Sequence, residues 1–275
     1  MKNNRFLFAI AAALLMMTSG CKLSNNNDYA NAMERYINEY GEVTMGDKKD
    51  AEHYVMGDAA FAATEVRELG IDWMNDSVTV EAYDGTELVI SETSDKALND
   101  TTTMYHYLNA KGKLNIKFGK PGVRVKVKEM GIPDKHLLVR VPRTLHLGEV
   151  EVNGVGYNFR MDSVSCNTFE INSVTNQVTL NECEINEVEA NSVCVTIEAT
   201  FSKMPKEMES NNVSGETVLW VPEDAGITIE MEGVMSDFRS ELPVVKKRNK
   251  KVIGNGACNI ESNSVSGKLD IKVKK

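Results

Sequence analysis

The sequence predicts an all-β protein whose body is a β-solenoid-like stack of short strands, preceded by one short helix. Three observations support this fold class. A short phrase recurs six times at a spacing near twenty residues, most of the chain alternates apolar and polar residues with a period of two, and turn pairs such as DG and PG separate the alternating runs. A fixed period of this length is typical of stacked structural units rather than of a single sandwich.

The N-terminus, residues 1–20, has the form of a secretory signal peptide. Lys2 and Arg5 precede an apolar run at 6–17, which is too short to cross a bilayer as a helix. The run leads into TSGC, which resembles a bacterial lipobox and predicts cleavage before Cys21 with a lipid on its thiol. Ordinary secretion, with Cys21 free or bridged, is the alternative.

Residues 21–65 are predicted to form a lipid-anchored tether and the short helix. A polar stretch at 22–28 follows the cysteine, and apolar and aromatic residues recur at helical spacing over 29–40. Lys22 at the second mature position, where no aspartate stands, favours the outer membrane, on its periplasmic face or at the cell surface. The lipid is the expected contact with the membrane.

The composition is acidic, which argues against a nucleic-acid partner. The formal net charge is −9, and removal of residues 1–20 makes the chain more negative because Lys2 and Arg5 leave with them. Four cysteines follow Cys21 at spacings that match no CxxC zinc pattern, so they are expected to be small, mostly buried residues with one bridge possible. The disulfide pairing stays open among Cys166, Cys183, Cys194 and Cys258.

The β body is predicted over residues 66–275. Alternation of apolar residues predicts strands near 69–73, 78–82, 88–90, 114–118, 123–127 and 137–141. The six copies of the repeat are EVNGV, EINSV, EANSV, ESNNV, EMEGV and ESNSV, starting at Glu151, Glu170, Glu189, Glu209, Glu230 and Glu261. Successive starts differ by 19, 19, 20, 21 and 31 residues, and the last step holds the basic run KKRNKK at 246–251. The copy at 261–267 is therefore expected to form the final layer.

Side-chain parity within each copy predicts a corner. If Ile171 and Val174 both point inward, the chain must turn between them, at Asn172 and Ser173. Asparagine suits a corner because it tolerates the left-handed conformation, and stacked amides can bond up and down a column. A second bend is expected at the Ser-Gly that follows some copies. The predicted corner residues are Asn153, Asn172, Asn191, Asn211, Asn263, Gly215 and Gly267, and Glu232 is expected to break the column.

No residue pattern indicates catalysis, a metal site or a cofactor. Stacking would align the first glutamates of the copies at about 4.8 Å, and a solvated edge relieved by lysines is favoured over a calcium-binding or sugar-binding strip. The four scattered histidines are expected at the surface or at edges, and KKRNKK in a solvated loop. Trp73 and Trp220 are expected in the core or at the solenoid end rather than as sugar-stacking platforms.

Three segments together resemble the bacterial putative adhesin family. They are VRELGIDWMNDSVTVEAYDGTELVISETS at 66–94, LLVRVPRTLHLGEVEV at 137–152 and GNGACNIESNSVSGKLDIKV at 254–273, and the likeness covers about residues 53–273. The family has a domain of unknown function with repeated V-S-G phrases, and the resemblance implies a β-solenoid and no catalytic residues. Two middle copies depart from the phrase, because SVTN at 173–176 and SVCV at 192–195 lack the glycine.

The expected function is that of an exported, lipid-anchored, adhesin-like binding or structural module of the cell envelope, and not an enzyme. The expected ligand is a glycan or a protein at the surface of the extended sheet. Two alternatives remain open. One is an enzyme acting on envelope polysaccharide, which needs carboxylates converging in a groove, and the other is an envelope-stress accessory with a protein partner.

Overall fold

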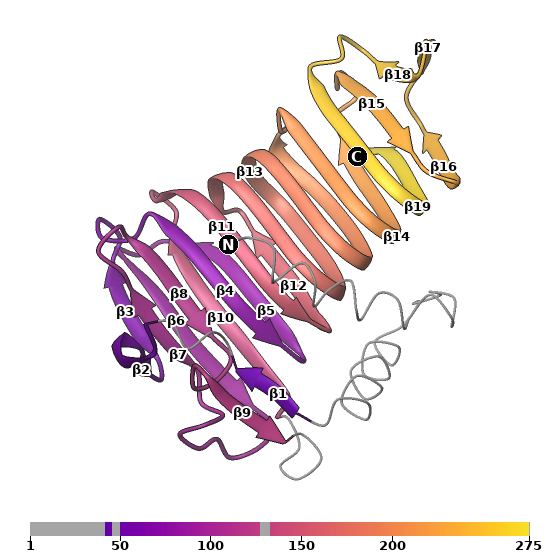
Figure 1. The fold of residues 1–275 in the computed structure, drawn as a ribbon. Helices are drawn as coiled ribbons and strands as arrows, with labels where there is room; N and C mark the ends of the chain where they lie inside the picture. Colours follow the sequence, from indigo (N-terminus) through magenta and orange to yellow (C-terminus); the bar gives the residue numbers. More distant parts are fainter. Residues whose placement is uncertain (1–41, 46–49, 127–132, 275) are drawn as a thin grey trace.

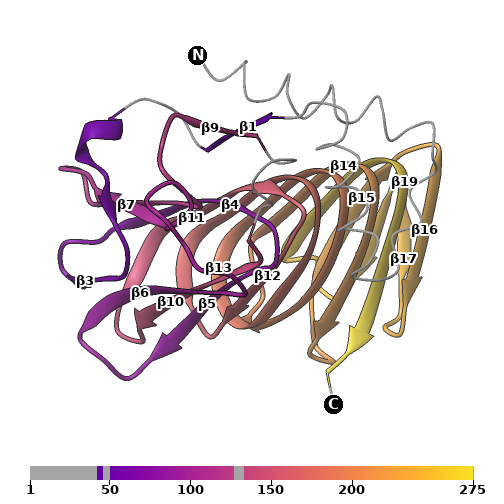
Figure 2. The same ribbon diagram turned by 90° about the horizontal axis from the view of Figure 1, so that it is seen from below.

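The computed structural model describes residues 42–45, 50–126 and 133–274. Over these residues the chain winds in coils, and each complete coil gives one strand to each of two sheets that lie face to face (Figures 1 and 2). The predicted all-β, solenoid-like fold is confirmed. The predicted signal peptide, Cys21 and the predicted helix over 29–40 lie outside the described residues.

The first sheet runs from the N-terminal to the C-terminal end of the stack through eleven labelled strands, of which β13 spans two coils and gives two arms. In spatial order they are β2 (Val55–Met56), β7 (Tyr105–Leu108), β8 (Lys113–Lys117), β4 (Glu68–Met74), β11 (His146–Val155), β13 (Ser165–Lys203), β14 (Glu207–Val221), β19 (Cys258–Val273), β15 (Ile227–Glu232), β18 (Lys250–Ile253) and β17 (Val245–Lys247).

The second sheet faces the first. In spatial order its strands are β3 (Ala59–Ala62), β6 (Glu87–Ser94), β10 (Lys135–Pro142), β5 (Ser77–Tyr83), β12 (Tyr157–Asp162), two arms of β13, one arm each of β14 and β19, and β16 (Met235–Ser240). A separate antiparallel pair joins β1 (Glu42–Met45) to β9 (Val123–Lys126), and a short 3-10 helix covers Ala51–His53. Because β3 already pairs with β6, the β fold begins before the boundary expected at residue 66.

The repeats stack in register, but their order in the stack differs from their order in the sequence. Glu151 lies opposite Glu170, and Glu189 lies opposite Glu209. Strand β19 then lies between β14 and the β15–β16 layer, because Glu261 is paired with Glu209 on one side and with Glu230 on the other (Figure 1). The expectation that the last repeat forms the final layer is therefore wrong.

The chain passes over one layer position, builds β15, β16 and the β17–β18 hairpin, and returns to fill the gap. The 31-residue step in the repeat holds this excursion. Strand β19 gains a hydrogen-bonding partner on both sides by this route, which leaves the less regular β15–β16 layer at the end. The similar phrases ESNNVSG at 209–215 and ESNSVSG at 261–267 thus belong to adjacent layers.

The core fills the space between the two sheets. Alternate residues of each arm point inward, so that Ile171, Ile197, Leu219 and Ile271 are each at most 2% exposed. Full burial of each such side chain stabilises the fold by roughly 1.5–3 kcal/mol.

The N-terminal part of the core holds a buried lysine. Lys135 is fully buried, and its Nζ donates to Glu92 Oε2 at 2.5 Å and lies 4.2 Å from the ring centre of Phe118. Two carbonyl oxygens, of Thr102 and Phe118, accept its other hydrogen bonds. A charged residue is thus tolerated in the core because each of its donors has a partner.

Each coil turns at two kinds of corner. The bend between the sheets lies in the Asn-x-Val segment, since β13 pairs with β11 up to Ser173 and with β12 from Asn176. None of the column asparagines has a positive φ. Left-handed residues occur at this bend only in the two N-terminal coils, at Asn75, Asp76 and Gly156, and at the opposite corner at Ser163 and Glu182. The conformational reason expected for asparagine is therefore wrong, and its amide hydrogen bonds explain the position instead.

Gly215 and Gly267 lie opposite one another just after the bend. Neither has a positive φ, so backbone conformation does not require glycine. A Cβ on Gly215 would stand 2.7 Å from Asn212 Oδ1, and one on Gly267 would stand 2.2 Å from Ser264 Oγ. The glycines leave room for polar side chains that fold across the corner.

Candidate functional site

An asparagine ladder runs along the outer face of the first sheet. Asn263, Asn211, Asn191 and Asn172 each donate from Nδ2 to the Oδ1 of the next asparagine toward the N-terminal end, at 3.0–3.1 Å, and Asn153 completes the ladder. Asn153 in turn donates to Asp72 Oδ1 at 3.1 Å. Because every amide points the same way, the ladder is a directional chain of hydrogen bonds.

A glutamate row lies beside the ladder. Nδ2 of four of the asparagines also donates to Oε1 of the glutamate two residues earlier, at 2.7–2.9 Å; these glutamates are Glu151, Glu170, Glu189 and Glu209. Each amide therefore bridges its own coil and the neighbouring coil. The charge of the stacked carboxylates is partly offset by these donors.

Lysines close both ends of this polar surface. Lys117 pairs with Asp72, Lys113 Nζ lies 2.7 Å from Glu151 Oε2, and Lys250 pairs with Glu230. Burial alone would lower the pKa of Lys113, but the carboxylates of Glu151 and Glu149 outweigh it and the pKa is raised. Glu232, which lies opposite Asn263, ends the column rather than interrupting it.

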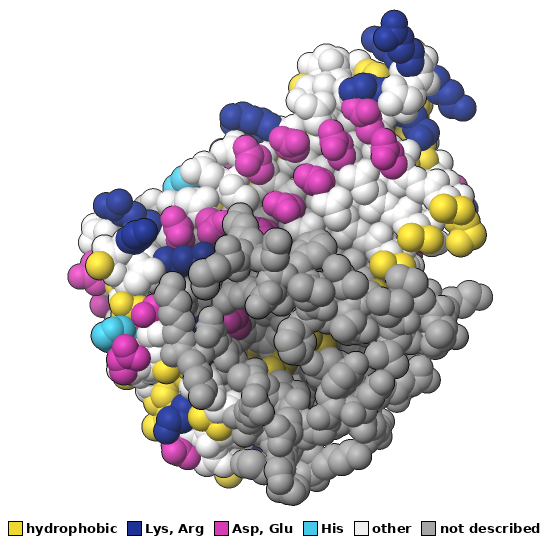
Figure 3. Space-filling view, in the orientation of Figure 1, with side chains coloured by type: hydrophobic (Ala, Val, Ile, Leu, Met, Phe, Trp, Pro, Cys, Tyr) yellow, Lys and Arg dark blue, Asp and Glu magenta, His cyan; other side chains and the backbone are white. Residues whose placement is uncertain are grey.

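Acidic side chains lie spaced along this face of the stack, with other side chains between them (Figure 3). Within the described part of the chain, no group of three or more His, Cys, Asp or Glu residues is arranged to hold a metal ion. The hydrogen bonds of the ladder use one carboxylate oxygen of each inner glutamate. The surface thus has the features of a structural seam between coils.

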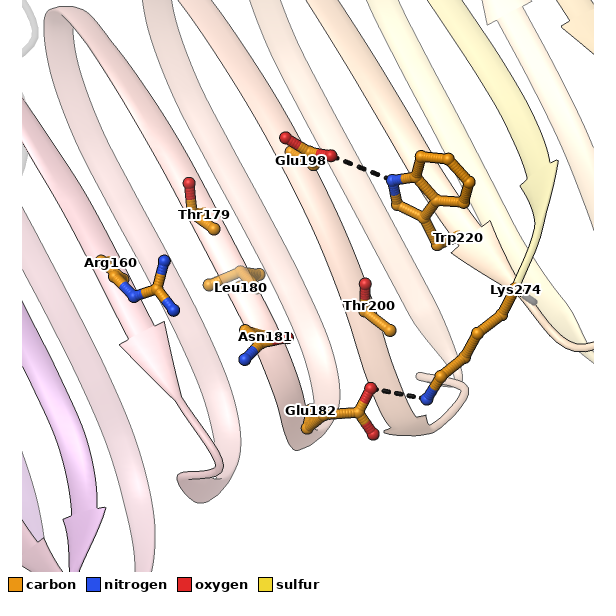
Figure 4. Close-up of a pocket in the computed structure, with 9 residues that line it drawn as sticks. All are labelled: Arg160, Thr179, Leu180, Asn181, Glu182, Glu198, Thr200, Trp220 and Lys274. Carbon is orange, nitrogen blue, oxygen red and sulfur yellow. Dashed lines mark hydrogen bonds and ion pairs between the residues drawn. The ribbon is translucent and has the colours of Figure 1, made fainter.

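A shallow groove crosses the outer face of the second sheet. It has a volume of about 420 Å³, and its lining residues are Arg160, Thr179, Leu180, Asn181, Glu182, Glu198, Thr200, Trp220 and Lys274 (Figure 4). Thr179, Asn181 and Thr200 give it a floor of short polar side chains. Arg160 and Trp220 stand three strand spacings apart across it, or about 14 Å.

Trp220 is the aromatic wall of the groove. Its neighbours in β14, Leu219 and Val221, are buried, so strand alternation turns the indole outward, where it is partly exposed. The indole Nε1 donates to Glu198 Oε1 at 3.0 Å, and Lys272 Nζ lies 4.9 Å from the ring centre. These contacts hold the ring in place while part of it stays accessible to solvent.

The charged groups of the groove are paired with one another. Arg160 Nη2 donates to Asp162 Oδ1 at 2.8 Å, and this carboxylate raises the pKa of the guanidinium. Lys274 Nζ donates to Glu182 Oε1 at 2.5 Å across the mouth of the groove (Figure 4). The groove is therefore polar but close to balanced in charge.

The two tryptophans lie in different environments. Trp73 is 1% exposed in the core, as expected, and its Nε1 donates to the carbonyl of Lys135. Trp220 belongs to the groove, so the expectation of a core or end position is wrong for it. Its place between Leu219 and Val221 is the signal that could have shown this.

The histidines mostly lie at the surface, with one exception. His106 is 7% exposed, and burial lowers its pKa. His146 is exposed and contacts Ser165 and Asn167 of the next coil. The basic run KKRNKK also differs from expectation, because it forms most of the β17–β18 hairpin instead of an irregular loop.

Three of the cysteines are buried free thiols. They are Cys166, Cys183 and Cys258. Burial raises the pKa of Cys166 and Cys258 to about 12 and that of Cys183 to about 11. Thiols with such high pKa values are poor nucleophiles, so these residues are packing groups.

The groove and the asparagine ladder lie in a segment that matches a family model. Residues 143–274 match the family model described as Toastrack DUF4097. The match covers slightly less than half of the chain, and over that segment the chain is similar to this family. The expected membership of a domain family of unknown function is confirmed for this part of the chain, whereas the resemblance was expected from residue 53 onward. All groove residues, and every ladder asparagine, lie within the matched segment.

Two solved structures are similar to parts of this chain. The crystal structure of a putative cell adhesion protein from Clostridium sporogenes has a TM-score of 0.48 and 13% identity, and the alignment covers 80% of this chain and 100% of that one. A putative adhesin from Bacteroides fragilis has a TM-score of 0.31 and 13% identity, with 80% and 97% of the two chains covered. A search of curated proteins finds no match. No helix in the described residues is long and apolar enough to span a membrane.

Proposed function

We propose that this chain is an exported, lipid-anchored, adhesin-like module that binds a saccharide of the cell envelope in the Trp220 groove. The observation that carries the proposal is the partly exposed indole beside a floor of Thr and Asn side chains. An indole face offers apolar contact to the C–H face of a sugar ring, and hydroxyl and amide groups hydrogen-bond sugar hydroxyls.

The charge balance of the groove favours a neutral saccharide. Arg160 and Lys274 are each already paired with a carboxylate, and Glu198 accepts from the indole of Trp220. A strongly anionic or cationic ligand would have to break one of these pairs. A neutral sugar can instead add hydrogen bonds to the outer edges of the paired groups.

The proposed location of the protein in the cell envelope is supported by features of the N-terminal sequence. The apolar run at 6–17 and the TSGC segment support export and lipid attachment at Cys21, and the polar stretch after the cysteine supports a tether. The same features support an outer-membrane position. The anchor would hold the groove close to envelope polysaccharide or to neighbouring cells.

An enzyme acting on polysaccharide is the rival interpretation, because Glu182 and Glu198 both line the groove. Each of these carboxylates has a fixed partner, Lys274 for the first and the indole of Trp220 for the second. A carboxylate that already accepts such a hydrogen bond is held in place by it and is less available to act as a general acid or base. We therefore favour binding without turnover.

The test uses the mature chain, residues 21–275, with Cys21→Ser to remove the lipid site. A glycan array and calorimetry with the best hits should show binding that Trp220→Ala weakens at least tenfold, as is common for a central aromatic contact. Thr200→Arg, which fills the floor, should weaken it similarly. Tyr83→Ala, a partly exposed aromatic outside the groove, is the matched control and should bind like the wild type.

Two results would oppose the proposal. Absence of binding to any envelope saccharide would remove its basis, and equal affinity of the Trp220→Ala and wild-type chains would place the site elsewhere. Release of new reducing ends from a bound polysaccharide would favour the enzyme interpretation instead. Thermal unfolding of each variant should confirm that the fold is retained.

A further inference from the structure

The exposed large apolar side chains gather at the two ends of the stack. Val55 and Met56, on β2 at the N-terminal end, are 60% and 49% exposed. At the C-terminal end Val234, Met235 and Val245 are 84%, 64% and 58% exposed. Of the described residues in this class, one other, Val265, lies in an inner layer. Monomers seldom leave such groups uncovered on terminal strands.

Both sheets also end in strands with an open edge. Among the described residues, β2 pairs with β7 and β3 pairs with β6, each on one side. At the other end β17 pairs with β18 and β16 pairs with β19, again on one side. Within the part of the chain that the structure describes, each end of the stack therefore presents one edge of the first sheet and one edge of the second that is paired on one side.

The core itself is incompletely closed at the C-terminal end. A hollow of about 390 Å³ lies there, and it is lined by Met231, Gly233, Ser236, Phe238, Val244, Lys246 and Lys251. Met231, Phe238 and Val244 are partly buried residues that pack against the core from outside. Lys251 Nζ stands 5.1 Å from the ring centre of Phe238, so a basic rim surrounds an apolar floor.

The charges of the two ends are opposite. The run at 246–251 holds five basic residues in six, and it forms most of the β17–β18 hairpin at the C-terminal end. The segment at 50–68, which contains β2 and β3, holds five acidic residues and one basic residue. Opposite charges on two surfaces of one molecule favour contact between copies in a fixed direction.

We propose that the C-terminal end of one copy of this chain docks on the N-terminal end of a second copy. In this arrangement β16 lies against β3 and β17 against β2 of the next copy, so that both sheets continue across the junction. The basic hairpin then faces the acidic segment, and the apolar residues of both ends are covered. The contact is head-to-tail and does not close, so it builds rows of copies.

The experiment blocks one end at a time in the mature chain, residues 21–275 with Cys21→Ser. The double variant Val234→Asp, Met235→Asp blocks the C-terminal end, because its new carboxylates would face the acidic N-terminal end of the next copy. Val55→Lys with Met56→Lys places base toward the basic hairpin and blocks the N-terminal end. All four positions are exposed, so the fold should persist, and thermal unfolding checks this.

Sedimentation velocity over a wide concentration range provides the measurement. The wild-type chain should grow in mass with concentration, and less so at high salt because the charge attraction is screened. Each blocked variant should stay monomeric alone, whereas an equimolar mixture of the two should associate, because each variant supplies the free end that the other lacks. Val265→Asp, which alters an exposed valine of an inner layer, is the matched control and should assemble like the wild type.

Three outcomes would overturn the proposal. They are a wild-type chain that stays monomeric at every concentration, blocked variants that assemble like the wild type, and a single blocked variant that still forms a symmetric dimer through its free end. Binding of an acidic peptide to a chain that never self-associates would assign the C-terminal end to another partner. Saccharide binding is measured separately, so the two proposals can fail independently.

Discussion

Replacement of Asn191 by alanine tests the asparagine ladder at its centre. Asn191 Nδ2 donates to Asn172 Oδ1 at 3.1 Å and to Glu189 Oε1 at 2.7 Å, and Asn191 Oδ1 accepts from Asn211 at 3.1 Å. Three hydrogen bonds of about 1 kcal/mol each would sum to about 3 kcal/mol. Because the side chain is half-buried and water can replace part of the loss, the expected decrease in the free energy of unfolding is about 2 kcal/mol.

Urea titration, followed by circular dichroism, measures this change. Asn191→Asp should cost more than Asn191→Ala, because a carboxylate would replace the donor and face both Asn172 Oδ1 and Glu189. The matched control is Asn186→Ala, which removes one exposed amide bond, from Asn186 Nδ2 to Asn167 Oδ1 at 3.0 Å, and should cost at most about 0.5 kcal/mol. If Asn191→Ala costs no more than this control, the ladder does not stabilise the fold and the reasoning is refuted.

Three further predictions concern the core and the layer order. Lys135→Met should lower the free energy of unfolding by about 3–5 kcal/mol because Glu92 is left buried without its cation, and adding Glu92→Leu should restore part of it; a silent single variant would contradict this. The three free buried thiols should resist a disulfide reagent at pH 8 until the chain unfolds, and rapid labelling of the folded chain would disprove their burial. Because folding raises the pKa of these thiols, the free energy of unfolding should fall as the pH rises above about 9, where the thiols of the unfolded chain ionise. Removing β19 should cause aggregation, since β14 and β16 both lose a paired edge; a soluble, equally stable product would contradict the layer order.

The repeat made the architecture predictable because it reports which residues share a column. Parity around Ile171 and Val174 predicted a bend at Asn172 and Ser173, and the pairing changes from β11 to β12 just after it, between Ser173 and Asn176. Layer order was not predictable in the same way, since a repeat shows that coils stack but not that one coil can be inserted later. The sequence holds one clue to the layer order. The copies at 209–215 and 261–267 share six of seven residues, as expected for two segments that lie in adjacent inner layers.

Other features depend on contacts that sequence spacing does not show. The partners Glu92 and Lys135 are 43 residues apart, and nothing near either residue indicates that a charged pair lies in the core. The groove depends on the outward direction of Trp220. That direction follows from the place of Trp220 between two inward-pointing residues, and not from its being a tryptophan. The remaining walls of the groove come from separate coils, and the regular stack brings them together.

The one-way direction of the asparagine ladder also sets a unit of length for the molecule. Each coil presents a donor to the coil before it and an acceptor to the coil after it, so every inner junction is chemically the same. A segment of 19 or 20 residues that keeps the asparagine in phase can therefore be inserted or deleted without leaving an unmatched amide. Coil number is free to vary, while coil length is held fixed by the need to meet the next rung.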